Sequence, residues 1–323
     1  MAKLNIDVLP IPAKFRDKSL PAMDKSYNWP QFSVMVAIHL LPFGAFFTGT
    51  NWADWAVCIA LYWIRMFAVT GGYHRYFAHR TYKTSRVFQF ILAFVAQTSS
   101  QKGTLWWAAH HRKHHKFSDT PWDAHSPARL GFWHSHVMWF YYPDNDPTDL
   151  KQVRDLAKYP ELIWLNKHWK FPVVVLGVAV LWTFGWSGLF IGFGLSTALC
   201  WHGTFTINSL SHVFGSRRYA TTDTSRNNFL LALITMGEGW HNNHHHYMGS
   251  TRQGFYWWEI DATYYILRAL SVVGIVWDLR PVPEAILEEG RSGVKPPTSA
   301  EVIRSQVSRS SGFDDPGPPA QAA

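Results

Sequence analysis

Three clusters of histidines, each just outside a long apolar stretch, constrain the fold of this chain more than any other feature. They span residues 74–79, 111–115 and 241–245. Neutral imidazole is a strong ligand for first-row transition metals, so histidines grouped in this way indicate a metal site. Because these ligands stand at the ends of apolar runs, the sequence predicts a membrane-bound metalloenzyme.

The composition fits several bilayer spans attached to a polar domain. Of the 323 residues, 47% are hydrophobic and 18 are tryptophan, which is favoured at membrane–water interfaces. The net charge of +8 suits a cytoplasmic surface that faces anionic lipid. No nucleic-acid-binding motif accompanies this charge, so we expect no nucleic-acid partner.

Two pairs of apolar runs predict two helical hairpins, with spans at about 33–50 and 52–72 and at about 171–185 and 188–208. The two tight turns contain no Lys or Arg, whereas the segments outside the hairpins are rich in both. The positive-inside rule therefore predicts that both termini and all three clusters are cytoplasmic. The expected fold is an all-α integral membrane protein with four transmembrane helices, capped by a cytosolic helical domain.

The expected boundaries follow from the same composition. Residues 1–30 are basic and Pro-rich and predict a cytosolic N-terminal arm. Residues 31–285 form the membrane domain, with cytosolic catalytic parts at 73–170 and 209–285. The tail at 286–323 is rich in Ser, Pro and Gly and is expected to be disordered.

Spacing within the clusters indicates which side chains share a face. Residues three and four positions apart on a helix are neighbours, as are the histidines within 111–115 and within 241–245. Asn208 and His212 are also four apart, at the end of the last apolar run. We therefore expect these groups to project together.

His74 and His79 are five positions apart, so the second membrane helix is expected to end or distort between them. Nine histidine nitrogens are too many for one ion and suit two ions with open positions. Sites this rich in imidazole suit iron better than structural zinc. The predicted metal site consists of His74, His79, His111, His114, His115, His212, His241, His244, His245 and Asn208.

The clusters and their order along the chain resemble the three histidine boxes of the membrane fatty-acid desaturases. The matching motifs are His74-Arg-Tyr-Phe-Ala-His79, His111-Arg-Lys-His114-His115 and His241-Asn-Asn-His244-His245. The segment from Asn208 to His212 resembles a further ligand segment of the Δ9, stearoyl-CoA-desaturase-like branch of bacterial type. The resemblance implies an inner-membrane enzyme with two iron ions. It would use O2 and two electrons to form a cis double bond, at Δ9, in a saturated acyl chain.

The same resemblance implies how the ligands are shared. One iron would take His74, His79, His111, His115 and His245. The other would take His114, His212, His241 and His244, with Asn208 holding a water. By the same comparison, the loop before the third box, with Asp223, Arg226 and Asn227-Asn228, is expected to form hydrogen bonds behind the ligands.

The position of a double bond along a featureless alkyl chain can be chosen only by measuring from one end in a narrow tunnel. Four residues about one turn apart below His74 are candidates for its closed end: Cys58, Tyr62, Met66 and Thr70. The alternative is that these side chains only face other helices.

The head group of the substrate is less well specified. Animal acyl-CoA desaturases carry an Arg-Asp pair directly before the second box, where this chain has Ala109-His110. Four basic residues nearby are candidates for binding phosphates, or form a solvated face: Lys102, Arg112, Lys113 and Lys116. We expect acyl-CoA as the substrate, with an intact phospholipid as the second choice.

No electron-carrying domain is evident in the chain, since it has neither a glycine-rich dinucleotide motif nor a cysteine cluster. A separate ferredoxin-like or small cytochrome donor with an NAD(P)H reductase is expected, and the basic surface suits an acidic partner. The alternatives are a hydroxylase or alkane monooxygenase of the same superfamily and, more remotely, a membrane metal-binding or transport protein.

Overall fold

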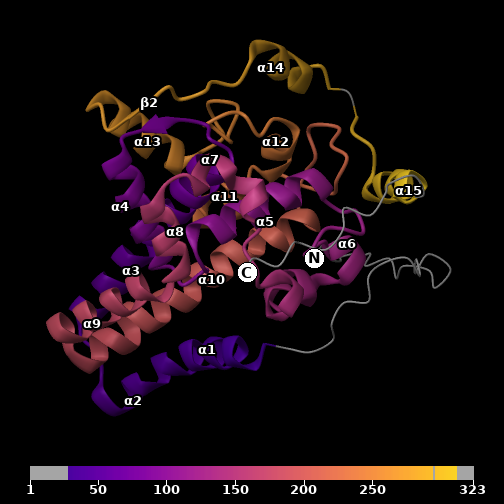
Figure 1. Ribbon diagram of the computed structural model, residues 1–323. Coiled ribbons are helices and arrows are strands. Elements are labelled where there is room, and N and C mark those ends of the chain that lie inside the picture. The colour runs from indigo at the N-terminus through magenta and orange to yellow at the C-terminus, as the bar shows by residue number, and fades with distance from the viewer. Residues whose placement is uncertain (1–27, 294, 311–323) are drawn as a thin grey trace.

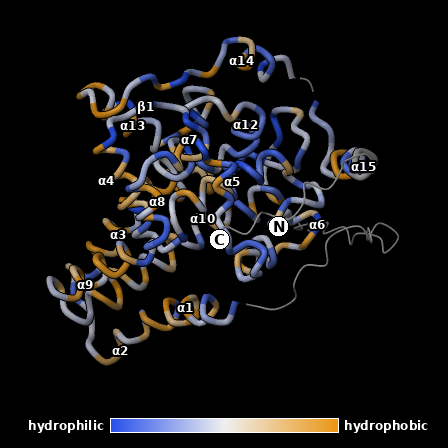
Figure 2. Tube along the Cα trace, in the orientation of Figure 1, coloured by the Kyte–Doolittle hydropathy of each residue, from blue (hydrophilic) through white to orange (hydrophobic). Residues whose placement is uncertain are grey.

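The computed structural model describes residues 28–293 and 295–310, which form mostly helices (Figure 1). The predicted N-terminal arm lies outside the described residues except for its last three positions. Hydrophobic residues are concentrated in α1, α2, α3 and α9, at one end of the molecule, and hydrophilic residues around α12 at the other (Figure 2).

The first apolar helix runs through α1 (Trp29–Leu40), η2 (Leu41–Gly44) and α2 (Ala45–Thr48). It begins where the Asn28 side chain accepts a hydrogen bond from the Gln31 N–H, and it ends at Gly49, whose φ is 70°. The second begins at Asn51, which forms a reciprocal capping box with Asp54. It continues through α3 (Trp52–Phe67) and η3 (Ala68–Ala78), which is π-helical.

The third apolar stretch comprises α9 (Lys170–Ser187), η8 (Gly188–Leu195), α10 (Ser196–Asn208) and η9 (Leu210–His212). Its helical geometry is broken at Gly185, with φ 69° and ψ −165°. Gly177 and Phe193 lie eight residues on either side of this break, and a Cβ atom on Gly177 would be 3.7 Å from the Phe193 ring. The chain therefore folds back on itself at Gly185, close to the predicted turn.

Among the described residues, three helices are long and apolar enough to cross a membrane: Trp29–Thr48, Trp52–Ala78 and Lys170–His212. The last has 43 residues and contains the break. Since a span needs about 20 residues, this stretch as a whole has about twice the length of one crossing.

The remaining elements, here called the cap, lie at 79–169 and 213–310. Its longer helices between the apolar stretches are α4 (Arg86–Gln97), α5 (Thr104–Phe117) and α8 (Pro160–Lys167), joined by the short elements α6 (Pro127–Leu130), η4 (His134–Met138), η5 (Trp139–Tyr141), η6 (Pro143–Asn145), η7 (Leu150–Val153) and α7 (Arg154–Ala157). After the third stretch come α11 (Phe229–Ile234), α12 (His241–His246) and α13 (Ala262–Val272). A buried apolar cluster that includes Phe77, Ala93, Leu105 and Leu162 fixes α4, α5 and α8 against η3.

Two short strands, β1 (Lys83–Thr84) and β2 (Val276–Trp277), pair antiparallel with Lys83 opposite Trp277. The all-α prediction did not include them. They tie the chain just after the first histidine cluster to the end of α13.

The tail differs from the expectation of disorder at 286–323. Residues 284–291 form α14 (Glu284–Arg291), and 299–310 form α15 (Ser299–Ser310). Val302 is only 3% exposed, and the Tyr219 hydroxyl donates to the Ile286 carbonyl at 3.0 Å. The composition of the segment suggested disorder. A few buried contacts are nevertheless enough to order a polar segment. Residues 311–323 lie outside the described part.

Candidate metal centre

The predicted ligands lie on η3, α5, α10, η9 and α12, with His79 directly after the end of η3. The π-helical geometry of η3 explains the unusual spacing of its two histidines. The His79 N–H donates to the carbonyl of His74, five residues back, at 3.1 Å. Such a turn is wider than an α-helical turn, so both rings point the same way. This is the distortion that the sequence predicts between them.

A first group brings together five rings: His74, His79, His111, His115 and His244. One ring nitrogen of each lies within 4.8 Å of those of the others. The Nε2 atoms of His74 and His244 are 3.0 Å apart, and those of His79 and His111 are 2.9 Å apart. The rings therefore present their Nε2 atoms to one common point.

A second group consists of four buried rings: His114, His212, His241 and His245. The Nε2 atoms of His212 and His241 are 3.1 Å apart. Together the two groups contain all nine histidines singled out from the sequence.

The sharing of ligands differs from the expected one at two positions. His244 belongs to the first group and His245 to the second, the reverse of what the resemblance implied. His241 and His245 are four residues apart on α12, so their rings lie on one face, with centroids 4.2 Å apart. His244 projects toward the other side, where it meets His74.

Four buried carboxylates stand behind the rings, each facing the Nδ1 atom of one histidine. The pairs are His74 with Glu238, His114 with Asp123 at 3.1 Å, His212 with Asp119 at 3.8 Å and His245 with Asp223 at 2.6 Å. A carboxylate at Nδ1 fixes the ring orientation and leaves the Nε2 lone pair free, which is the usual arrangement behind metal-bound histidine. Asp223 was expected in this role. The other three carboxylates were not predicted as site residues.

Burial keeps five of the nine rings neutral. Burial first, and then the neighbouring imidazoles, hold the pKa of five rings well below the usual range: His79, His111, His115, His241 and His244. Burial raises the pKa of Asp223, but His245 beside it outweighs this effect and holds that pKa well below its usual range. The Asp223 carboxylate is therefore ionised behind His245.

The donor set fits metal ions. The Nε2 atom of His245 is buried and has no hydrogen-bond partner among the described residues, although its Nδ1 atom is bonded to Asp223. A buried polar atom without a partner is costly, and here it lies among other imidazole nitrogens. Two bound cations would satisfy these lone pairs, so the residues fit two metal ions.

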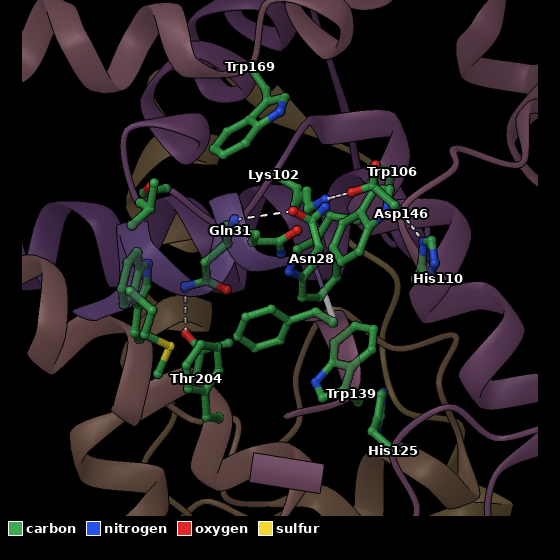
Figure 3. A pocket seen from close by; sticks show the side chains of 18 of the residues that line it. Asn28, Gln31, Lys102, Trp106, His110, His125, Trp139, Asp146, Trp169 and Thr204 are labelled. Atoms are coloured by element: carbon green, nitrogen blue, oxygen red, sulfur yellow. Dashed lines mark hydrogen bonds and ion pairs between the residues drawn. The ribbon is translucent and has the colours of Figure 1, made fainter. Parts of the chain in front are cut away.

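Two cavities meet beside the histidines. The outer one, of about 330 Å³, is lined by aromatic rings including Trp106, Trp139 and Trp169 (Figure 3). The inner one, of about 30 Å³, is lined by apolar side chains and by members of both groups, including His74 and His241. Four residues line both cavities: Trp107, His111, Thr204 and Asn208. An extended ligand that enters the outer cavity and continues inward therefore passes the histidines.

The fatty acid desaturase family model matches residues 50–274, which include both histidine groups. The chain belongs to the fatty acid desaturase family. The resemblance seen in the sequence is thereby confirmed.

The matches to curated relatives cover most of this desaturase and most of the length of each relative. It is 37% identical over 261 residues to the Delta-9 acyl-lipid desaturase 2 of Arabidopsis thaliana, covering 80% of this chain and 84% of the relative. The sn-1 stearoyl-lipid 9-desaturase of Anabaena variabilis is 34% identical over 78% of this chain and 94% of its own. The acyl-CoA C20 Delta5-desaturase of Anemone leveillei is 34% identical, over 85% and 89%. The relatives thus differ in the head group that their names give.

The four tunnel candidates of the desaturase fall into two pairs. Met66 and Thr70 line the inner cavity. Tyr62 and Cys58 line neither of the two described cavities. Tyr62 packs against Met66, and its hydroxyl donates to the Ile234 carbonyl at 2.5 Å. The inner cavity therefore ends about two helical turns nearer the histidines than the full set of candidates implied.

Of the four basic candidates for head-group binding, Lys102 alone lines a described cavity, and it pairs with Asp146 (Figure 3). The Arg112 guanidinium is held by Asp155 at 2.6 Å and by the carbonyls of Phe77 and Ala78. Lys113 and Lys116 are exposed and line neither described cavity.

The residue before the second box, His110, lines the outer cavity as an uncharged ring. It stacks on Trp106 with centroids 4.2 Å apart. Burial lowers its pKa to about 4. The position at which animal acyl-CoA desaturases carry a charged pair is therefore neutral in this chain.

Proposed function

We propose that this protein is an O2-dependent di-iron desaturase that introduces a cis double bond, at Δ9, into a saturated fatty acyl chain for unsaturated fatty acid synthesis. The observation that carries the proposal is the course of the two cavities past both histidine groups. When bound, two iron ions would supply the O2-dependent oxidation that removes two hydrogens from an unactivated methylene pair.

The contribution of the chain is to hold and to orient. The first group would bind one iron through five imidazoles, and the second group the other through four, with Asn208 holding a water. The carboxylates behind the rings would keep four Nε2 atoms aimed at the ions, those of His74, His114, His212 and His245. The apolar side chains at the inner cavity, such as those of Met66, Val69 and Ile207, would orient the acyl chain and keep bulk water from the reacting carbons.

For the membrane topology, we propose four crossings, with the break at Gly185 as the turn of the second hairpin. The termini and the metal centre would then be cytoplasmic, in a bacterial inner membrane. Electrons would come from a separate ferredoxin-like or small cytochrome donor, reduced by an NAD(P)H reductase.

The head group is proposed on the contacts at the outer cavity. Acyl-CoA was expected, and a CoA head group carries several phosphate charges. The Lys102 ammonium is compensated by Asp146, and His110 is uncharged. These contacts favour a lipid-linked acyl chain. Supplying the purified enzyme and a competent donor system with the same acyl chain as CoA thioester or as phospholipid distinguishes the two, and faster turnover of the thioester would reverse the choice.

The function is tested by expressing the full chain, together with an electron donor system, in a host that lacks its own desaturase. We expect mass spectrometry of the fatty acids to show a new cis double bond at Δ9. A hydroxylated product would identify a hydroxylase instead. Unchanged fatty acids with iron-loaded enzyme and a working donor would contradict the proposal.

We expect replacement of Met66 by Ala to shift the preferred acyl chain to a greater length. Met66 lines the inner cavity, and the smaller side chain leaves room for roughly two further carbons. One methylene in an apolar pocket changes selectivity by about 10–200-fold, so the ratio of products from longer and shorter chains is expected to rise at least about tenfold. Product analysis on mixed chain lengths measures this ratio.

The matched control for Met66→Ala is Ile59→Ala, on the same helix but with its side chain 59% exposed. It removes a similar apolar group without enlarging the cavity, so the product ratio is expected to stay at the wild-type value. An equal shift in both variants would show that Met66 does not limit the tunnel.

A further inference from the structure

Helix α15 is fastened to the cap by one buried amide. Val302 and Gln306 are four residues apart and are 3% and 8% exposed, so one face of the helix is buried. The Gln306 Nε2 atom donates to the Ser118 carbonyl at 3.2 Å and to the Thr222 carbonyl. A single side chain thus links two backbone segments that are far apart in the sequence.

Both linked segments lead directly to carboxylates of the second histidine group. Asp119, next to Ser118, accepts hydrogen bonds from the N–H and hydroxyl of Thr224 at 2.6 and 2.7 Å and faces His212. Asp223, next to Thr222, accepts the bond from His245 Nδ1 at 2.6 Å. The link made by Gln306 therefore lies one residue behind each of these carboxylates.

The start of α15 is attached to the same part of the cap. Arg217 donates to the Pro297 carbonyl at 2.8 Å, and Arg226 donates to the Ser299 hydroxyl at 2.7 Å. Thr298 and Glu301 cap the helix reciprocally, through bonds of 2.7 and 3.3 Å. The helix is thus held at its first turn and at Gln306 against the segment that carries Asp223.

We propose that Gln306 is a positioning residue for the second metal of the centre. The inference rests on the proposed function, in which His212 and His245 hold that metal. Ser118 follows the last turn of α5, where carbonyls lack partners within the helix. By binding this carbonyl and that of Thr222, Gln306 keeps Asp119 and Asp223 in register, and through them the rings of His212 and His245.

In the first histidine group, other residues hold the carboxylate behind the ring. The proposal therefore concerns the second metal alone. The carboxylate of the first group, Glu238, is held by the Arg75 guanidinium at 3.0 Å and by Gln253 at 3.0 Å. Among the described residues, Gln306 bonds to neither of these. Loss of the Gln306 amide is therefore expected to loosen one ion and to leave the other unchanged.

The test compares Gln306→Met, which keeps the length of the side chain but removes the donor, with Arg304→Met on the exposed face of α15. The full-length proteins are loaded with iron, and release to a chelator is followed over time. Replacing partners behind metal ligands costs about 10–100-fold in affinity, so one of the two ions is expected to leave about tenfold faster from Gln306→Met. Arg304→Met is expected to release both ions as the wild type does.

Hydrogen exchange of the metal-free proteins gives a readout that does not depend on iron. Gln306→Met is expected to lose protection at 118–125 and 221–226 but not at 74–82. Gln306→Glu, which replaces the donor by an acceptor of the same shape, is expected to give the same local loss.

Faster release of both ions, or loss of protection throughout the cap, would show that Gln306 only supports the fold. Unchanged release and exchange would also overturn the inference, while the proposed function would stand. If the wild-type protein retained no metal, the proposed function would fail instead, and exchange at 118–125 and 221–226 would still decide whether Gln306 orders these segments.

Discussion

His115→Ala is expected to abolish desaturation and to remove one of the two metal ions. His115 belongs to the first group, and its Nε2 atom lies 3.0 Å from those of both His111 and His244. Changing a partner behind a ligand already costs about 10–100-fold in metal affinity or activity, so loss of a ligand is expected to lower activity by more than about a hundredfold. Metal content per chain and mass spectrometry of the products measure the two effects.

The control is His168→Ala, which removes an exposed histidine that belongs to neither group. It is expected to keep both the metal content and the product yield of the wild type. His115→Ala with full metal content and normal yield would show that the first group does not hold a metal. Loss of metal without loss of product would separate metal binding from the reaction.

The histidines themselves were predictable because their signal is local. Spacings of three and four residues place side chains on one helical face whatever surrounds the helix. Even the distortion between His74 and His79 follows from their spacing of five, and the structure provides it as a π-helical turn. All nine predicted histidines accordingly lie in one group or the other.

The grouping of His244 and His245 differs from the expected one because it depends on which way α12 faces. That orientation is set by partners distant in the sequence, such as His74 for His244 and Asp223 for His245. Adjacent residues on a short helix carry no local signal that distinguishes these two directions.

The carboxylates at positions 119, 123 and 238 were missed for a similar reason. In a sequence, an isolated Asp or Glu is typical of a solvated surface charge. Only tertiary contacts place each of these carboxylates behind a histidine ring. The order in the tail escaped prediction because it depends on two side chains, Val302 and Gln306, in an otherwise polar segment. A buried side chain at each of two positions four residues apart is a weak pattern in one sequence.

Arg75→Met is expected to destabilise the folded protein by about 3–5 kcal/mol, because it leaves two buried carboxylates without a counter-charge. The Arg75 guanidinium is 1% exposed and bridges Glu238 at 3.0 Å and Asp261 at 2.9 Å. It also donates to the Thr251 carbonyl at 2.9 Å. Thermal unfolding of the purified full chain in detergent, followed by loss of helical signal, measures the change in stability.

The matched control is Arg86→Met, which breaks an ion pair with Glu161 of good geometry on the surface. Water solvates the freed carboxylate there, so little change in stability is expected. Since Glu238 also holds His74, Arg75→Met is further expected to weaken metal binding by the first group, whereas Arg86→Met leaves it intact. Equal stability losses in the two variants would mean that burial of the Arg75 bridge adds nothing. Equal metal binding in the two variants would mean that another contact holds Glu238 behind His74.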